Sequence, residues 1–406
     1  MLTNWAGNVV FSAERLVAPR SISELRDVVA GARQAHVLGT GHSFSRIADT
    51  TGTLISVADL PEVVEIGTGV VRVSAGMRLG ELADRLHRSG LALHNLPSLP
   101  HISLAGACAT ATHGSGDTSG SLASAVRSVD LVTADGTMIT VARGDEDFGG
   151  VVAALGALGV VTTMQVDVVP AFDVEQRVYL DLPWSVLVDR FDEVFASAYS
   201  VSVFTDWRGS IRAWVKRRTD QAPASLAWTG AREATTPEHP VPGLSGEICT
   251  RQLGVPGPWH ERLPHFRSDF TPSVGDELQS EYLVPRAHAG EALRALGEVA
   301  ARIAPVVQTA EIRTVAADDC WLSPAHGRDS VAFHFTWTPD LNPVLAAVAT
   351  VEGTLAPWSP RAHPGKVSSL PQSGEVRWSN FAALRARLDP TGKFGNPAID
   401  ALLATG

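Results

Sequence analysis

The chain is poor in cysteine, in long hydrophobic runs and in clustered positive charge. Its 406 residues include 3 cysteines, which are scattered and form neither a zinc-site spacing nor a disulfide framework. No window approaches the ~18 consecutive apolar residues of a membrane span, and the first residues lack a basic flank followed by an apolar segment. The formal net charge is −10 without any basic run, which disfavours a nucleic-acid partner. We therefore expect a soluble, monomeric cytoplasmic protein without a metal site.

Several catalytic fingerprints are also missing. Gly39-Thr40-Gly41 does not extend to G-x-G-x-x-G, so a nicotinamide-binding Rossmann site is disfavoured. The chain contains no Walker motif, no H-E-x-x-H and no G-x-S-x-G. Composition is otherwise that of a globular protein, with 45% hydrophobic and 19% charged residues.

Two loops of small residues stand out in the N-terminal part. The first, residues 37–44, follows an apolar strand and carries His42 at its apex, and the second covers residues 103–116. Glycine lets the backbone approach a ligand closely and turn its N–H groups toward a phosphate. Two such loops predict a cofactor with a long phosphate bridge. Taken alone, His42 also fits an ordinary turn histidine, and His113 fits a structural role.

Periodicity and turn signals predict an α+β fold in two domains. For the first domain they predict a capped helix at 21–32, hairpins at 63–74 and 131–141, helices at 79–86 and 147–155, and a strand at 160–169. For the second they predict a loop at 222–258, helices at 291–303 and 344–351, and strands at 306–315 and 330–337. A last helix is expected at 381–388. The predicted domains are 1–172, to which 376–406 return, and 173–375, built on an antiparallel sheet.

Polar and apolar residues alternate along the two predicted strands of the second domain. Thr309, Glu311 and Arg313 share one face of the first strand, and His334 and Thr336 share one face of the second. The pattern is typical of a sheet with one solvated face. It also fits a face that binds a small hydroxylated ligand, because Glu accepts hydrogen bonds, Arg donates them, and His and Thr do either. The residues alone leave both interpretations open.

Several motifs together resemble the FAD-binding flavoproteins of the vanillyl-alcohol oxidase, or p-cresol methylhydroxylase (PCMH) type. They are the two small-residue loops, the run at 98–103, the strand entry at 156–162 and the C-terminal turn at 389–396, which reads Asp-Pro-x-Gly-x-Phe-x-Asn. Further runs resemble the alditol (xylitol) oxidases within that family, and these are 204–208, 254–262, 278–283 and 311–318. The resemblance covers nearly the whole chain.

The resemblance implies a PCMH-type FAD-binding domain with a substrate-binding cap, and oxidation of the terminal CH–OH of alditols such as xylitol or sorbitol to the aldose, with O₂ reduced to H₂O₂. It implies that His42 carries FAD covalently and that Lys366 and His334 act at the reacting hydroxyl. The substrate-binding residues that it implies are Ser103, Glu311, Arg313 and Thr336. The further FAD contacts that it implies are Val37, Leu38, Gly39, Thr40, Gly41, Ser43, Ser103, Cys108, Ala111, Gly114, Ser115, Gly116, Asp117, Val166 and His363.

One segment departs from the family pattern, and other functions stay open. Where the family has His-Trp-Gly-Lys, this chain has His363-Pro364-Gly365-Lys366. Proline fixes φ and removes an N–H, so we expect Lys366, otherwise read as an exposed lysine, to approach the site at a different angle. The alternatives are a lactone or sugar dehydrogenase of the same fold with an acceptor other than O₂, a flavin- or sugar-binding protein without turnover, and, more distantly, an NAD-dependent dehydrogenase.

Overall fold

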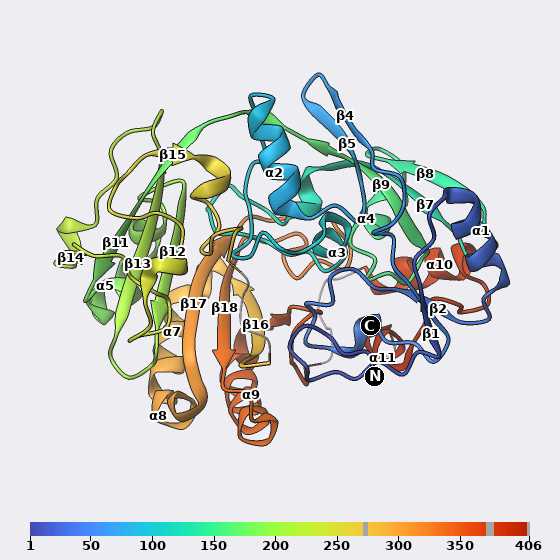
Figure 1. Cartoon of the computed structure of the whole chain (residues 1–406). Helices are drawn as coiled ribbons and strands as arrows, with labels where there is room; N and C mark the ends of the chain where they lie inside the picture. The colour runs from blue at the N-terminus through green and yellow to red at the C-terminus, as the bar shows by residue number, and fades with distance from the viewer. Residues whose placement is uncertain (271–274, 371–376, 404–406) are drawn as a thin grey trace.

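A computed structural model describes residues 1–270, 275–370 and 377–403, and two β-sheets organise its two halves (Figure 1). The smaller sheet runs in the order β4-β5-β9-β7-β8. Its strands are β4 (Val64–Gly67), β5 (Val70–Ser74), β7 (Val126–Val132), β8 (Met138–Ala142) and β9 (Val160–Asp167). A parallel sheet of order β1-β3-β2 lies in the same half, with β1 (Arg15–Val17), β2 (Ala35–Val37) and β3 (Thr53–Ile55).

The larger sheet runs in the order β14-β11-β13-β12-β17-β18-β16-β19, and β15 pairs with β11 beside that path. Its pairings within the described residues are all antiparallel. Its strands are β11 (Asp173–Leu180), β12 (Ser200–Thr205), β13 (Ile211–Arg218), β14 (Arg232–Glu233), β15 (Gly257–Pro258), β16 (Leu278–Pro285), β17 (Val307–Val315), β18 (Ser330–Trp337) and β19 (Arg361–Ala362). The short strands β6 (Leu91–Ala92) and β10 (Val169–Pro170) pair separately.

Helices pack against both sheets, and the α+β prediction is confirmed. Around the smaller sheet lie α1 (Ile22–Gly31), α2 (Leu79–Arg88), α3 (Leu104–Ala109), α4 (Phe148–Val152), α10 (Trp378–Leu388) and α11 (Pro397–Leu403). Around the larger sheet lie α5 (Trp184–Asp189), α6 (Phe191–Phe195), α7 (Ala289–Glu298), α8 (Ala300–Ile303) and α9 (Leu341–Leu355). The N-terminus and α11, the last described helix, lie in the half with the smaller sheet (Figure 1).

In the N-terminal half, a predicted helix cap and two predicted hairpin turns are present in the structure. Ser21 caps α1 through its side chain, which accepts a hydrogen bond from the Glu24 N–H at 3.1 Å. Gly69 and Gly136 have φ of +69° and +82° in the turns of the β4–β5 and β7–β8 hairpins. Glycine adopts such φ without the strain that a Cβ would add, so both predicted hairpins form in register.

The alternation predicted for β17 and β18 is confirmed by their pairing. Glu311 lies opposite His334 and Thr309 opposite Thr336, while Ile312 lies opposite Phe333. The apolar face packs with residues of α7 and α9 in one large hydrophobic cluster. Since helices cover that face, the polar face is left to form the wall of an internal cavity.

Some expected elements differ from those observed. The helix expected at 291–303 is divided into α7 and α8, and the loop expected at 222–258 contains the short strands β14 and β15. The domain limits 1–172, 173–375 and 376–406 stay a prediction, and residues 376 and 404–406 of the last segment lie outside the described residues.

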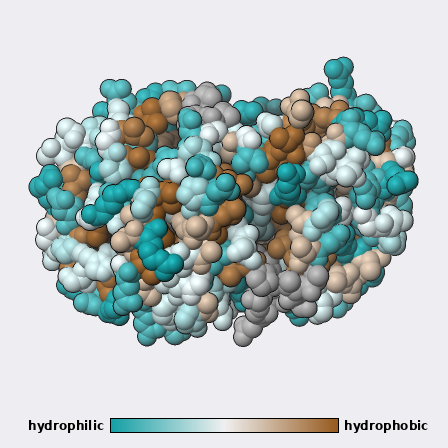
Figure 2. Space-filling model, turned by 90° about the horizontal axis from the view of Figure 1, so that it is seen from below, coloured by the Kyte–Doolittle hydropathy of each residue, from teal (hydrophilic) through white to brown (hydrophobic). Residues whose placement is uncertain are grey.

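On the face seen from below, the described hydrophobic and hydrophilic residues are mixed and form no large patch of either kind (Figure 2). Large hydrophobic side chains that are exposed, such as Leu16, Ile66 and Leu244, belong to separate parts of the chain. Among the described helices, none combines the length and the apolar character that crossing a bilayer requires.

Candidate active site

A cavity of about 590 Å³ is lined by residues from both halves of the molecule. On one side lie residues 36–45 together with Ser103, Ala105 and Gly106, which we call the loop wall. On the other lie polar residues of the larger sheet and of the segment after it, which we call the sheet wall: Gln279, Glu281, Thr309, Glu311, Arg313, His334, Thr336, His363 and Lys366. The cavity therefore joins the two small-residue loops to the polar sheet face.

Glycine at two positions of the loop wall leaves room for the Ser103 side chain. A Cβ built on Gly39 would lie 2.8 Å from the Ser103 Oγ, and one built on Gly106, in the helix that Ser103 begins, would lie 2.8 Å from the same atom. Gly41 has a φ of +70°, which a side chain rarely tolerates. Glycine at 39 thus lets the first loop pack closely on Ser103 and on the start of α3.

His42 is held on the loop wall by the N-terminal segment. Its ring stacks on Trp5 with centroids 5.2 Å apart and an interplanar angle of 14°. Its Nδ1 lies 3.0 Å from the Thr40 Oγ1, and the Trp5 N–H donates to the Gly41 carbonyl at 2.7 Å. Burial lowers the pKa of His42 to about 4, so the imidazole is neutral at pH 7. A neutral, oriented imidazole can act as a nucleophile.

Glu281 lies at the centre of the charged groups in the sheet wall. It accepts hydrogen bonds from the Arg313 guanidinium and from the Lys366 Nζ, the latter at 2.7 Å, and the His113 Nε2 lies 3.3 Å away. Burial would raise the pKa of Glu281, but Arg313 and Lys366 outweigh it and hold that pKa well below 4.5. Burial lowers the pKa of Lys366, and the charge of Glu281 opposes this shift. The ion pair thus holds the ammonium group at the cavity.

Glu311 forms a second buried group with histidines. Its Oε1 lies 2.7 Å from the His265 Nε2, and its Oε2 lies 3.6 Å from the His334 Nδ1. Burial raises the pKa of Glu311, yet Arg313 and His265 hold it well below its ordinary value. Burial, reinforced by the charge of Lys366, lowers the pKa of His334 to about 4. The His334 Nε2 is buried and has no hydrogen-bond partner within the described residues, so it is free to bind a group in the cavity.

The structure brings most of the predicted site residues into one cavity. Those that line it are Val37, Leu38, Gly39, Thr40, Gly41, His42, Ser43, Ser103, Glu311, Arg313, His334, Thr336, His363 and Lys366. Glu311 and Arg313 are 3% and 4% exposed, which excludes the interpretation of a solvated sheet face. The reading of Lys366 as an exposed lysine is also wrong, because its side chain is largely buried and paired with Glu281.

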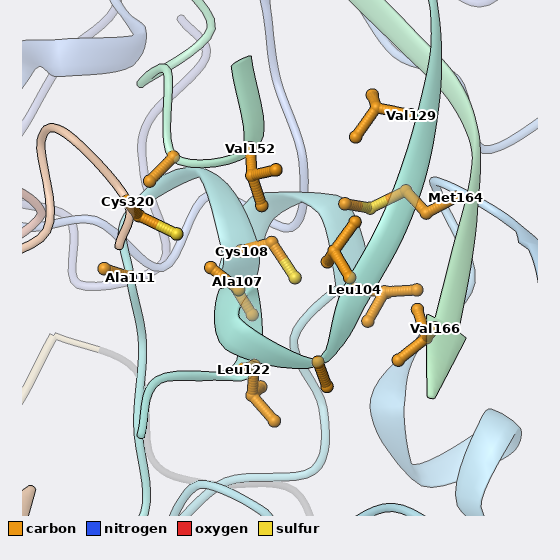
Figure 3. Packing of buried hydrophobic residues seen from close by; sticks show 14 of the residues in the cluster. Leu104, Ala107, Cys108, Ala111, Leu122, Val129, Val152, Met164, Val166 and Cys320 are labelled. Atoms are coloured by element: carbon orange, nitrogen blue, oxygen red, sulfur yellow. The ribbon is translucent and has the colours of Figure 1, made fainter. Parts of the chain in front are cut away.

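Seven predicted FAD contacts are not among the residues that line this cavity. Cys108, Ala111 and Val166 lie among apolar side chains of the hydrophobic cluster around α3 (Figure 3). Burial raises the pKa of the Cys108 thiol to about 12, which makes it inert. Their role as cofactor contacts stays a prediction.

The other four belong to the segment that follows His113. Gly114 and Ser115 line a second, much smaller cavity beside Glu311 and Arg313. The Gly116 N–H donates to the Thr314 carbonyl at 3.0 Å. Asp117 forms an ion pair with Arg286 at 2.7 Å. Gly116 and Asp117 thus have structural partners, and the predicted contacts of all four residues with FAD also stay predictions.

The Pro364 segment is fixed to the loop that carries His42. The Ser45 Oγ donates to the Pro364 carbonyl at 2.7 Å, and the Phe44 N–H donates to the Gly365 carbonyl at 2.7 Å. Lys366 reaches Glu281 from this segment, so proline at 364 is compatible with an ammonium group in the cavity. The expected change in its angle of approach stays a prediction.

Sequence reasoning missed Glu281 and His265 and underrated His113. Gln279 and Glu281 both line the cavity and alternate with Ser280 and Tyr282 along β16, so the same period of 2 that revealed β17 could have revealed them. His265 lies outside regular structure, and no local pattern marks it. Among the described residues, no group of three His, Cys, Asp or Glu side chains is suited to hold a metal ion.

Comparisons with known proteins agree with this arrangement. A family model described as an FAD binding domain matches residues 13–142, and one described as D-arabinono-1,4-lactone oxidase matches residues 276–402. The chain is 51% identical over 413 residues to an alditol oxidase of Streptomyces sp. (strain IKD472 / FERM P-14339), covering 99% of both chains. It is 31% identical to an L-gulono-1,4-lactone dehydrogenase of Mycobacterium tuberculosis, covering 97% of both chains.

The solved structures with a similar fold include a solvent-stable cholesterol oxidase. Its TM-score is 0.78 over 99% of this chain and 97% of that chain, at 16% sequence identity. A cholesterol oxidase from Brevibacterium sterolicum gives a TM-score of 0.78 at 14% identity. At such identities the likeness concerns the fold alone, which is the two-part PCMH-type FAD fold that the sequence predicted.

Proposed function

Because the chain belongs to the vanillyl-alcohol oxidase (PCMH-type) family of FAD-dependent oxidoreductases, we propose that it oxidises the terminal CH–OH of alditols to the aldose and passes the electrons to O₂, giving H₂O₂. The observation that carries this proposal is the facing of the loop wall and the sheet wall across one cavity. A bound FAD and a polyol require such a pair of surfaces.

The residues present fit the cofactor. Gly39 and Gly106 place no side chain beside Ser103, which leaves the backbone of the two small-residue loops accessible to a long phosphate-bearing group. Residues 37–43, Ser103 and His363 would hold FAD. When bound, FAD supplies the two-electron acceptor for oxidation of an alcohol.

The sheet wall supplies the groups that an alcohol oxidation needs at the reacting carbon. The Nδ1–H of neutral His334 faces Glu311, so its unpartnered Nε2 is an acceptor that takes the hydroxyl proton as the C–H hydrogen leaves with its electron pair. The Lys366 ammonium stabilises the negative charge that develops on that oxygen. Glu311, Arg313, Thr336 and Ser103 hold the remaining hydroxyls, because they combine acceptors and donors around the same cavity.

We also propose that His42 carries FAD through a covalent bond. The neutral imidazole, its stacking on Trp5 and its place on the loop wall support this proposal. Acid precipitation of the wild-type protein should leave the yellow colour with the protein, and His42→Ala should release it to the supernatant. Release of all flavin from the wild type would overturn the proposal.

A second candidate is a lactone dehydrogenase with an acceptor other than O₂. The match of residues 276–402 to the lactone oxidase model and the 31% identity to an L-gulono-1,4-lactone dehydrogenase favour it. The 51% identity to an alditol oxidase favours the first function.

The two functions are separated by mixing the flavin-loaded protein with xylitol, sorbitol or L-gulono-1,4-lactone without O₂. We expect xylitol and sorbitol to bleach the flavin absorbance, and admission of air to restore it with release of H₂O₂. Bleaching by the lactone alone would establish the second candidate, and bleaching by neither would leave a binding protein without turnover. Gel filtration would test the further proposal that the chain is a monomer.

A further inference from the structure

A buried chain of polar groups leads away from the cavity behind Glu311. The His265 Nε2 lies 2.7 Å from the Glu311 Oε1, and its Nδ1 lies 3.1 Å from the Lys216 Nζ. Lys216 is 1% exposed and comes from β13, two strands away from β17 in the sheet order. Its Nζ also donates to the carbonyls of Leu263 and, at 3.1 Å, Pro264. The Nζ of Lys216 thus contacts two backbone carbonyls and one ring nitrogen.

The hydrogen bonds to Glu311 and Lys216 determine which nitrogen of His265 carries the proton. Burial lowers the pKa of Lys216 to about 7. The pKa of Glu311 is held well below its ordinary value, so its carboxylate can only accept from the His265 Nε2, and the Nδ1 is left to accept from the Lys216 Nζ. Burial lowers the pKa of His265 to about 4, which makes its imidazole neutral at pH 7. A neutral imidazole that accepts at Nδ1 carries its proton at Nε2, where it donates to the Glu311 carboxylate.

Aromatic rings fix the plane of the imidazole. The ring of Phe204 lies 5.4 Å from that of His265 at an angle of 73°, and the ring of Trp214 lies 5.3 Å from it at 78°. The backbone N–H of His265 donates to the Ser98 carbonyl at 3.1 Å. Ring and backbone are therefore both constrained, and the direction of the Nε2–H bond is set before any ligand enters.

We infer that His265 is a positioning residue, which holds the Oε1 of Glu311 so that the Oε2 is presented to the hydroxyl groups of the substrate, and that Lys216 enforces the required tautomer. The inference rests on the proposed function, in which Glu311 binds a polyol. Without the bond to His265, Glu311 can turn toward Arg313, whose Nε already lies 3.7 Å from its Oε2. The Glu311 carboxylate would then no longer be available to bind the substrate.

Two substitutions at residue 265 separate this role from simple packing. The amide nitrogen of glutamine can occupy the place of Nε2 and donate to Glu311, whereas asparagine reaches only the place of Nδ1, beside Lys216. We expect His265→Asn to lower kcat/KM for xylitol about tenfold or more, since a buried charge-assisted hydrogen bond is lost, and His265→Gln to recover most of that loss. Flavin content and Tm of both variants are measured alongside.

The outcomes are distinct. Equal kcat/KM for the two variants, at matched Tm, would overturn the inference, because a packing role does not distinguish them. If His265→Asn fails to fold, Lys216→Met carries the test at matched Tm: it keeps the ring and removes the donor to Nδ1, together with the donors to the Leu263 and Pro264 carbonyls. An unchanged kcat/KM would overturn the inference. If the wild type oxidises a lactone but no alditol, the proposed function fails, and the same variants are then compared on the lactone.

Discussion

The two walls of the cavity differ in the groups that they offer to a ligand. The loop wall carries many small residues and, apart from its histidines, no ionisable side chain, and its geometry depends on the absence of side chains at Gly39 and Gly106. The sheet wall is built of charged side chains that are buried and paired, with Glu281 and Glu311 between Arg313, Lys366 and histidines. Apart from Ser103 and His363, for which a role toward the other ligand is proposed, changes to the loop wall should therefore affect cofactor binding. Changes to the sheet wall should affect chemistry and acid stability.

The strongest test of this division is Lys366→Met, which removes the ammonium group that faces the reacting oxygen. We expect the rate of flavin reduction by xylitol to fall roughly 10²-fold or more, as is typical when a preorganised charge partner of the transition state is lost. Stopped-flow absorbance without O₂ measures this step directly.

The flavin content of Lys366→Met serves as the control, because Lys366 belongs to the sheet wall and not to the loop wall. It should equal that of the wild type. A rate of flavin reduction close to that of the wild type would remove Lys366 from the chemistry, and a loss of flavin would break the division between the walls.

The second test concerns acid stability and the charge of Glu281. Its pKa in the folded protein is well below its ordinary value of 4.5, so the unfolded chain binds its proton first as the pH falls. The stability that Glu281 contributes is thus fully present above about pH 5 and is lost as the pH falls through the folded-state pKa. Glu281→Gln should lower the free energy of unfolding at pH 7 by about 3 kcal/mol, because Arg313 and Lys366 lose the charged partner that they share. Tm should fall accordingly.

Measured from pH 7 down to pH 3, the difference in Tm between the wild type and Glu281→Gln should shrink. The reason is that the unfolded wild-type chain takes up a proton at Glu281 before the folded protein does, which favours unfolding of the wild type and not of the variant. Differential scanning fluorimetry in buffers of equal ionic strength gives this comparison. If the plots of Tm against pH of the two proteins stay parallel over the whole range, the charge of Glu281 does not stabilise the fold.

The two walls also differ in how far the sequence could predict them. The loop wall is one contiguous stretch plus a helix start, so the spacing of Gly39, Gly41 and Gly106 was visible along the chain. The polar faces of β17 and β18 were visible through their period of 2. What the alternation could not provide was the burial of these faces, which depends on the loop wall lying across the cavity.

The missing members of the sheet wall come from residues far apart in the sequence. Glu281 meets Lys366 across 85 positions, and His265 meets Glu311 across 46. The first pair follows from the strand order, in which β16 lies between β18 and β19, and Lys366 comes shortly after β19. The second does not, because His265 lies outside regular structure. For Cys108 and Val166 the role at the cofactor rests on the resemblance alone and stays a prediction, since their burial in the cluster of Figure 3 does not distinguish them from other core residues.

The subtlest test concerns the backbone of the loop wall and uses two glycines. Gly39→Ala adds a methyl group 2.8 Å from the Ser103 Oγ, so that side chain or the loop must shift by several tenths of an ångström. Gly31→Ala adds the same group at the end of α1, where no atom lies within 4 Å and φ is not positive. We expect Gly39→Ala to weaken FAD binding several-fold with little change in Tm, and Gly31→Ala to leave the flavin-to-protein absorbance ratio unchanged. Both variants are purified with limiting FAD, because excess cofactor would hide a modest loss of affinity. Equal flavin ratios in the two variants would show that the close packing of Gly39 against Ser103 serves packing alone. The loop wall would then have no demonstrated role in binding FAD.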